Sequence, residues 1–269
     1  MQKIILVTGS TDGIGLETAK ALAHQGHHVI IHGRNNQKVQ NVKKSLDMIG
    51  TGKIDTIVAD LSSFDALNSM IREVAERFGK LDILINNAGV YSTQQTQTKE
   101  NLDIRFMVNT IAPYLLVKSL LALFDESGRI INLSSAAQSS VDLLALQGTK
   151  VLSDGEAYAQ SKLALTMWSR VLGLKLKGKG PLVVSVNPKS FLGSKMVRNA
   201  YNIPGHDIQL GADILVKAAL SQEFSEAHGA YFDNDITAFA SPHTDALNDK
   251  KSNEVLATIE TLITKYTTH

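Results

Sequence analysis

A tyrosine and a lysine stand four residues apart in the segment AYAQSKLAL, at Tyr158 and Lys162. On a helix this spacing places both side chains on one face, about one turn apart. A phenol has an ordinary pKa of about 10, and a nearby ammonium stabilises the phenolate, which brings proton exchange closer to neutral pH. The pair can therefore act as acid and base on a carbinol oxygen.

The same spacing occurs a second time, at Tyr114 and Lys118. The chain has six tyrosines and 27 lysines and arginines, so a coincidental pair is unsurprising. Spacing alone is therefore not evidence of chemistry. The position of each pair relative to the rest of the fold must distinguish them.

Short apolar runs alternate with longer segments of helical period along the chain. The apolar runs cover residues 4–7, 29–31, 54–58, 81–85, 129–133 and 182–186, and the helical segments include 15–25, 64–78, 101–124 and 157–176. A last short strand is expected at Tyr231 and Phe232, followed by a turn with Asp233 and Asp235. Continuously apolar strands suit a sheet that is covered on both faces. The alternation predicts an α/β Rossmann fold, a doubly wound parallel sheet of about seven strands with helices on both faces.

The length and the hydrophobic content suit one large core. The chain has 269 residues, of which 43% are hydrophobic and 20% are charged. We expect a single domain over residues 1–269, with a cofactor half at about 1–135 and a catalytic and substrate-lid half at about 136–245. A C-terminal helix is expected at about 249–266.

Charge and cysteine content exclude several classes of partner and site. The balance of 27 basic against 26 acidic residues provides no general field for nucleic acid or an anionic membrane. The absence of cysteine excludes disulfides and thiolate sites, and the histidine spacing predicts no metal site. The first apolar run is too short for a signal peptide or a membrane span. We expect a cytoplasmic protein that acts on small molecules.

The segment VTGSTDGIG, from Val7 to Gly15, lies between the first expected strand and the first helix. Backbone amides in such a loop, together with the helix N-terminus, form a site for an anionic pyrophosphate. A second expected strand at 29–31 completes the βαβ unit that the motif requires. The predicted cofactor contacts are Gly9, Ser10, Thr11, Asp12, Gly13, Ile14 and Gly15.

The end of the second strand indicates which dinucleotide binds. A carboxylate there would bind the ribose hydroxyls of NAD, whereas a cation favours the additional phosphate of NADP. The sequence is IIHGRN, with Arg34, and no acidic residue occurs from 18 to 46. This favours NADP(H) over NAD(H), although Arg34 could also be a solvated loop residue. Asp60 and Leu61, after the third strand, are expected to contact the adenine.

Further motifs follow the glycine loop. They are NNAG at 86–89, Asn109, Ser135 within INLSSAA, and the cluster of Tyr158, Ser161 and Lys162. In this order the motifs resemble those of the short-chain dehydrogenase/reductase family in its single-domain form, up to about residue 235. The resemblance implies further cofactor contacts at Asn87, Ala88, Gly89, Tyr158, Lys162 and Pro188.

The resemblance also implies a reaction, hydride transfer between NADP(H) and a carbonyl or alcohol substrate. Tyr158 would be the acid and base, and Lys162 would hold the nicotinamide ribose and lower the pKa of the tyrosine. Ser135 would bind the substrate oxygen, with Ser134 as the competing choice. Asn109 would organise a water that connects the lysine to solvent. The alternative is a cofactor-binding sensor or scaffold with little or no turnover.

The order of the motifs separates the two tyrosine–lysine pairs. Tyr114 lies five residues after Asn109, which places it far around the helix from a residue that faces the cofactor. Tyr158 follows the strand that ends at Ser134 and Ser135, where open α/β sheets bind substrates. Tyr114 is therefore expected to pack within the protein, or with Lys118 to form part of a subunit contact in a homodimer or homotetramer.

Two departures from the family pattern concern the substrate side. Lys189, in VNPKSFLGSKMV, replaces the glycine expected beside the nicotinamide, and Ser194 is the counterpart of the hydroxyl residue that follows. The interval from Ser135 to Tyr158 is long, and we expect it to form part of the substrate mouth. Residues 191–209 are expected to form a lid over a fairly apolar carbonyl substrate.

Overall fold

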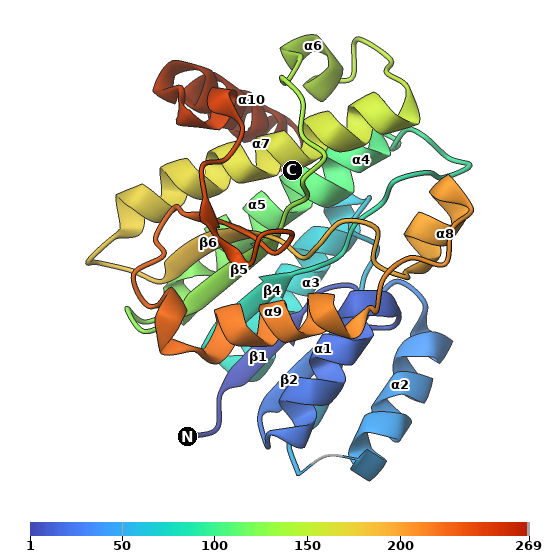
Figure 1. The fold of residues 1–269 in the computed structure, drawn as a ribbon, viewed down its shortest axis with the longest axis vertical. Helices are drawn as coiled ribbons and strands as arrows, with labels where there is room; N and C mark the ends of the chain where they lie inside the picture. The colour runs from blue at the N-terminus through green and yellow to red at the C-terminus, as the bar shows by residue number, and fades with distance from the viewer. Residues whose placement is uncertain (50, 268–269) are drawn as a thin grey trace.

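The computed structural model describes residues 1–49 and 51–267, and these form one eight-stranded sheet covered by helices on both faces (Figure 1). The strand order is β3-β2-β1-β4-β5-β6-β7-β8, and every neighbouring pair is parallel except β7 with β8. The strands are β1 (Ile4–Val7), β2 (His28–Gly33), β3 (Ile54–Val58), β4 (Ile83–Asn86), β5 (Arg129–Leu133), β6 (Leu182–Asn187), β7 (Tyr231–Asp233) and β8 (Ala238–Ala240).

The strand order reverses between β1 and β4, because β2 and β3 are added on one side of β1 and the later strands on the other. Such a switch point leaves a crevice at the carboxyl ends of the strands, where ligands bind. The helices are α1 (Gly13–His24), α2 (Asn36–Ile49), α3 (Phe64–Phe78), α4 (Ile104–Phe106), α5 (Ala112–Leu120), α6 (Leu143–Leu146), α7 (Asp154–Leu176), α8 (Lys195–Tyr201), α9 (Gln209–Leu220) and α10 (Asp249–Thr267).

Alternate residues of β1 to β6 belong to two separate apolar cores. Leu6 and Leu84 face the core under α3, α5, α7 and α10, whereas Ile5 and Ile85 face the core under α1 and α9. This follows from the period of two in a strand. Figure 1 shows α1 and α9 in front of the sheet. Both faces are covered, as the continuous apolar runs predicted.

The largest departure from the expected elements lies in the segment expected as a helix at 101–124. The helix begins at Ile104 and contains a π-helical stretch, η1 (Met107–Ile111), before α5. Pro113 lacks an N–H, so it cannot donate to the carbonyl of Asn109 four residues earlier. The wider turn therefore lies where the α-helical hydrogen-bond ladder is interrupted.

The sheet also has one strand more than expected. β8 pairs antiparallel with β7 through Phe232 and Phe239, and both rings contact Phe224. The three-residue strand is too short to show an alternating pattern in the sequence. Its place at the edge is decided by packing of these three rings.

One segment of the described chain, Ile104–Leu123, is long and apolar enough to cross a membrane by length and composition alone. Of its most apolar window, 72% is buried inside the protein. Much of this segment packs in the core under α3 and α7.

Candidate active site

A cavity of about 580 Å³ opens at the carboxyl ends of the parallel strands. It extends from the glycine loop and the end of β2, past the end of β4, to the start of α7 and to α8. Nearly all of the predicted site residues line it: Gly9, Thr11, Asp12, Gly13, Ile14, Gly15, Arg34, Asp60, Leu61, Asn87, Ala88, Gly89, Ser135, Tyr158, Lys162 and Pro188. Of the predicted site residues, which all lie in the described part of the chain, Ser10 and Asn109 do not line it.

The glycine loop needs its first glycine for two reasons. Gly9 has φ +64°, and a Cβ there would lie 2.8 Å from the Cα of Ala88. The loop after β4 is tied to it, because the Asn87 amide donates to the carbonyls of Thr8 and Gly9 at 2.9 and 3.1 Å. The Thr8 hydroxyl accepts from the backbone N–H of Asn87 and Ala88. Asn87 thus braces the loop as well as lining the cavity.

Ser10 faces the sheet because its hydroxyl is bound to β2. It accepts from the His32 N–H at 2.8 Å and donates to the His32 carbonyl at 3.3 Å. His32 is a residue that the sequence analysis missed, and it lines the cavity. Its ring accepts from the Gly9 N–H and lies 3.1 Å from the Ala59 carbonyl, so it donates there. Burial lowers the pKa of His32 to about 4, which keeps the ring neutral.

Two exposed cations lie at the end of the cavity beyond β2. Arg34 and Lys38 line this end together with Asp60 and Leu61. One oxygen of Asp60 accepts from the Ser62 N–H and hydroxyl at 2.9 and 2.7 Å, which fixes the turn after β3. This end of the cavity is therefore suited to an anionic group.

The catalytic candidates lie at the opposite end, where α7 crosses the end of β5. Ser153 caps α7, and Glu156 completes a capping box. Lys162 is 3% exposed, and its ammonium donates to the Leu133 carbonyl at 2.7 Å. Burial lowers the pKa of Lys162 from 10.5 to about 8. A buried ammonium with unused donors facing a cavity is suited to a polar ligand.

The pKa of Tyr158 is raised in the cofactor-free protein, whereas a nearby lysine was expected to lower it. Burial raises the pKa of its phenol to about 12, and interaction with the Ser135 hydroxyl counters part of that rise. The Lys162 ammonium lies 5.7 Å from the centre of the tyrosine ring. Desolvation thus outweighs any lowering of the pKa by the lysine, and the phenol is protonated at neutral pH.

The two serines after β5 have different surroundings. Ser134 is buried, and its hydroxyl lies 2.7 Å from the Thr166 hydroxyl of α7. Ser135 accepts from the Ala137 N–H at 3.1 Å and lies beside the Tyr158 phenol. Of the two candidates, Ser135 is the one placed next to the tyrosine.

Asn109 connects the loop after β4 to α7. Its side-chain oxygen accepts from the Val90 N–H at 2.8 Å, and its amide donates to the Val90 carbonyl and the Ser161 hydroxyl, both at 2.9 Å. Ser161 in turn donates to the Tyr158 carbonyl. The side chain therefore braces α7 against the loop after β4, and its oxygen keeps a second lone pair. Its role in organising a water stays a prediction.

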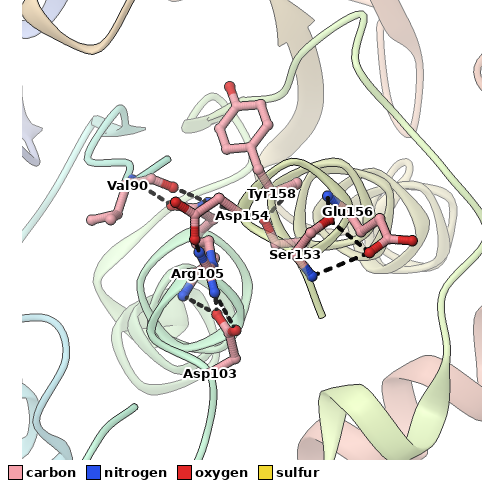
Figure 2. A network of polar contacts seen from close by, with 9 residues as sticks. Val90, Asp103, Arg105, Ser153, Asp154, Glu156 and Tyr158 are labelled. Carbon is pink, nitrogen blue, oxygen red and sulfur yellow. Dashed lines mark hydrogen bonds and ion pairs between the residues drawn. The ribbon is translucent and has the colours of Figure 1, made fainter. Parts of the chain in front are cut away.

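A buried arginine fixes the start of α7 from the side of α4. The Arg105 guanidinium is 1% exposed and lies between the carboxylates of Asp103 and Asp154 (Figure 2). Asp154 is also bound by the Ser92 hydroxyl, and these partners hold the pKa of its carboxyl below the ordinary range. The sequence analysis did not identify this cluster.

Lys189 keeps the backbone conformation that a glycine would adopt easily. Its φ is +120°, a region that side chains rarely occupy. The Asn187 side chain accepts from the Lys189 N–H and donates to Asp233 and Asp235. Asp235 also binds Ser190. The two aspartates after β7 therefore anchor the loop that holds Lys189 in this conformation.

The lid contacts the glycine loop directly. Ser194 caps α8, and the Lys195 ammonium forms an ion pair with Asp12. Burial raises the pKa of Asp12, but the hydrogen bond and charge of Lys195 outweigh that effect and lower it.

Tyr91, which the sequence analysis missed, lines the cavity next to the lid residue Tyr201. Its only sequence signal is that it follows NNAG by two residues.

The expectation for the segment between Ser135 and Tyr158 is largely wrong. Of residues 136–157, all of which the structure describes, only Ala137 lines the cavity. The segment contains α6, which contacts α10 on the far side of α7. Ala145 and Leu146 of α6 are buried there, so most of the segment does not form the substrate mouth.

The second tyrosine–lysine pair lies away from the cavity. The Tyr114 hydroxyl donates to Glu260 of α10 at 2.7 Å, and Lys118 lies 3.4 Å from the same carboxylate. The Tyr114 ring also meets the buried Trp168 edge to face at 5.3 Å. The pair thus contacts the C-terminal helix of its own chain.

The glycine cradle and the buried lysine fit a nicotinamide dinucleotide. Side chains at Gly9 would clash with Ala88, and a Cβ at Gly89 would lie 3.5 Å from the Lys162 ammonium. The backbone at these positions can therefore approach a ligand closely. The donors and cations lie at the two ends of one continuous cavity, as an extended anionic ligand requires.

Comparison with known proteins agrees with this fit. Human polyprenol dehydrogenase is 35% identical over 192 residues, which are 68% of this chain and 58% of that protein, so the chain spans less than two thirds of that relative. Mouse retinol dehydrogenase 12 is 33% identical over 247 residues, which are 86% of this chain and 77% of that protein. The angucycline C-6 ketoreductase LanV with bound NADP has 28% identity and a TM-score of 0.70, over 86% of this chain and 93% of that one. The short chain dehydrogenase family matches residues 3–202, and this chain belongs to that family.

Proposed function

We propose that the protein is an NADP(H)-dependent oxidoreductase that interconverts an apolar carbonyl compound and its alcohol, with Tyr158 as acid and base. One observation carries the proposal: the Tyr158 phenol, the Ser135 hydroxyl and the Lys162 ammonium lie together at one end of a cavity whose other end is the glycine cradle. The family and its NADP-bound relatives support an oxidoreductase.

The residues that would hold the dinucleotide are the glycine loop and Asn87, Ala88, Gly89, Lys162 and Pro188. When bound, the nicotinamide supplies the hydride. The Lys162 ammonium has a fixed acceptor in Leu133 and further N–H donors for ribose hydroxyls. Its position would keep the ribose close to Tyr158.

The proton comes from the protein. At neutral pH the Tyr158 phenol is protonated, because its pKa is raised to about 12. It can therefore donate to an alkoxide that develops in carbonyl reduction, and Ser135 beside it can orient the substrate oxygen. The protonated phenol thus supports carbonyl reduction as the direction of the reaction.

A path for replacing this proton would run from Tyr158 through Lys162 to solvent. Gly89 leaves open space beside both the Lys162 ammonium and the Asn109 side chain. The Asn109 side-chain oxygen borders that space and keeps a lone pair, so it can accept from a water there. Asn109 would thus serve the path through its side-chain oxygen and hold α7 through its amide.

The preference for NADP(H) is proposed from Arg34 and Lys38 at the cavity end beyond β2. Arg34→Ala should raise the KM for NADPH about 10- to 100-fold, the effect of a lost charge-assisted hydrogen bond. The KM for NADH should change less than about twofold. Lys43→Ala is the matched control. Lys43 is a described residue of α2 that pairs with Asp47 and does not line the cavity. Equal changes for both cofactors would contradict the preference.

The apolar substrate is proposed from the lid side of the cavity, which includes Phe191, Met196 and Val197. Retinol and polyprenol, in the names of two relatives, are apolar alcohols, and this supports the same substrate class. The test is NADPH and NADH oxidation over a panel of aldehydes, ketones and quinones, with Tyr158→Phe beside the wild type. Turnover that collapses in Tyr158→Phe supports the proposal, and turnover that survives it would contradict the assignment.

The second candidate is a cofactor-binding sensor with little turnover, and Lys189 is the observation that favours it. Its conformation costs about 1–3 kcal/mol, and its charge lies at the cavity beside Pro188. A sensor would bind NADPH equally well in wild type and Tyr158→Phe, and neither would turn over any member of the panel. Lys189→Gly should then restore turnover if the lysine is what prevents it.

A further inference from the structure

A row of aromatic rings crosses the substrate side of the cavity. Its members are Tyr158 on α7, Tyr91 in the loop after β4, and Tyr201 and Phe191 of the lid, and all four line the cavity. Ring centres are 5.0 Å apart for Tyr158 and Tyr91, 5.9 Å for Tyr91 and Tyr201, and 5.4 Å for Tyr201 and Phe191. Tyr91 is thus the ring between the proposed proton donor and the lid.

Tyr91 is held in place more firmly than the lid rings. Its hydroxyl lies over Gly155 in the first turn of α7, where a Cβ would approach it to 3.4 Å. The next residue, Ser92, binds Asp154, and Asp154 is held by the buried Arg105 (Figure 2). Tyr91 and Tyr158 are therefore both attached to the same end of α7.

The lid rings are exposed and reach toward Tyr91 from the other side. Tyr201 and Phe191 are 47% and 48% exposed, and the Tyr201 hydroxyl interacts with that of Tyr91. The side chains near them in the cavity include the apolar Val90, Met196 and Val197. A substrate whose carbonyl reaches Tyr158 must place the neighbouring part of its structure against this wall.

Aromatic rings attract other π systems beyond the burial of area, at centre separations of 4.5–7 Å. A saturated group of the same size gains the burial but not the additional attraction. We propose that Tyr91 is a specificity-determining residue, selecting substrates whose carbonyl is attached to a flat conjugated or aromatic group. This inference rests on the proposed reductase function.

The test compares two aldehydes that both carry a six-membered carbon ring, benzaldehyde and cyclohexanecarbaldehyde. For each, kcat/KM with NADPH is measured in wild type, Tyr91→Leu and Tyr91→Phe. The ratio of the two values should fall about two- to tenfold in Tyr91→Leu and stay unchanged in Tyr91→Phe. Taking the ratio within each protein removes any general loss from a displaced Tyr158, and comparing the ratio between variants removes the intrinsic difference in reactivity of the two aldehydes.

A second readout does not need turnover. Benzamide and cyclohexanecarboxamide are unreactive analogues, and their dissociation constants from the NADPH complex can be measured by NMR titration. The preference for benzamide should weaken in Tyr91→Leu by the same factor as the kinetic ratio. Tyr201→Leu, on the exposed lid, should change both ratios in the same direction but less, and it covers the case in which Tyr91→Leu does not fold.

Three outcomes are distinguishable. Ratios that fall in the leucine variants and persist in Tyr91→Phe support the inference. Ratios unchanged in every variant, with turnover present, overturn the role of Tyr91 and leave the reductase function standing. If wild type reduces neither these aldehydes nor any member of the wider panel, the reductase function fails, and this inference fails with it.

Discussion

The chain contains two tyrosine–lysine pairs with identical spacing and opposite surroundings. Lys162 is buried, donates to a backbone carbonyl and faces the cavity, whereas the side chain of Lys118 is 49% exposed and pairs with Glu260. Tyr158 lies beside the Ser135 hydroxyl, and Tyr114 donates to the same Glu260. The difference lies in what other segments of the chain bring to each pair.

The comparison shows that the pair at the cavity carries an energetic cost that the pair at α10 does not. A buried ammonium without a carboxylate partner is unfavourable, and a lowered pKa is the sign of that cost. The Tyr114 pair has a carboxylate, so each of its polar atoms contributes to holding α10 on the fold. The same two residue types are thus destabilised by burial at Lys162 and stabilised by an ion pair at Lys118.

The largest expected difference is in turnover. Tyr158→Phe should lower kcat for carbonyl reduction at least about 100-fold, because general acid catalysis contributes at least that factor. Tyr114→Phe should stay within about twofold of wild type, since its hydroxyl lies away from the cavity. Steady-state NADPH oxidation measures both. A large loss in Tyr114→Phe alone would reverse the assignment of the two pairs.

A second difference is expected in stability. Lys162→Met should raise the free energy of unfolding at pH 7 by about 2 kcal/mol. Removing the buried charge stabilises by about 3 kcal/mol, because the pKa is lowered from 10.5 to about 8. Losing the hydrogen bond to Leu133 destabilises by about 1 kcal/mol. Lys118→Met should give no gain.

The sign of this effect with pH provides its control. Between pH 8 and 10.5 the unfolded chain binds a proton at Lys162 that the folded protein has released, so the contribution of Lys162 to stability rises across this window. The stability gain of Lys162→Met over wild type in urea unfolding should therefore be largest below pH 8 and be lost above about pH 10.5, where only the cost of the missing hydrogen bond remains. A gain that persists there would have another cause.

A third difference concerns the pH dependence of activity. As pH rises through about 8, the Lys162 ammonium loses its charge, and kcat/KM for NADPH in the reductive direction should fall, approaching tenfold for each further pH unit. Lys118→Met should leave the profile unchanged. A profile that stays flat up to pH 10 would show that Lys162 does not titrate in this range.

The smallest expected effect is on the structural pair. Glu260→Gln should lower the free energy of unfolding by about 1 kcal/mol, because a hydrogen bond to a charged acceptor becomes a neutral one. Turnover should not change. Urea denaturation measures the first and NADPH oxidation the second. Glu254→Gln is the control, since Glu254 lies exposed on the same helix. An equal loss in both variants would contradict a specific role of Glu260.

The contact of Tyr114 and Lys118 with α10 also bears on assembly. The pair was expected to pack or to form a subunit contact; Tyr114 is buried and binds Glu260 of α10, whereas Lys118 is half exposed. A homodimer or homotetramer stays a prediction.

The glycine loop, the alternation of strands and helices, and the cluster around Tyr158 were predictable because their signals are local. The φ of Gly9, the two faces of each strand and the one-turn spacing of Tyr158 and Lys162 depend on residues close in the sequence. The sequence by itself thus determined the fold class, the edge of the sheet at which most predicted residues meet, and which tyrosine–lysine pair lies at the cavity.

The tertiary structure decided whatever depends on a distant partner. Ser10 turns to β2, Asn109 binds Val90 and Ser161, and Lys189 is held by aspartates more than 40 residues later. Tyr91 gains its place from α7 and the lid. A polar or aromatic side chain can serve many partners, and only the packing of segments remote in sequence selects one. Local patterns therefore determined where the site lies, and long-range contacts decided what each side chain does there.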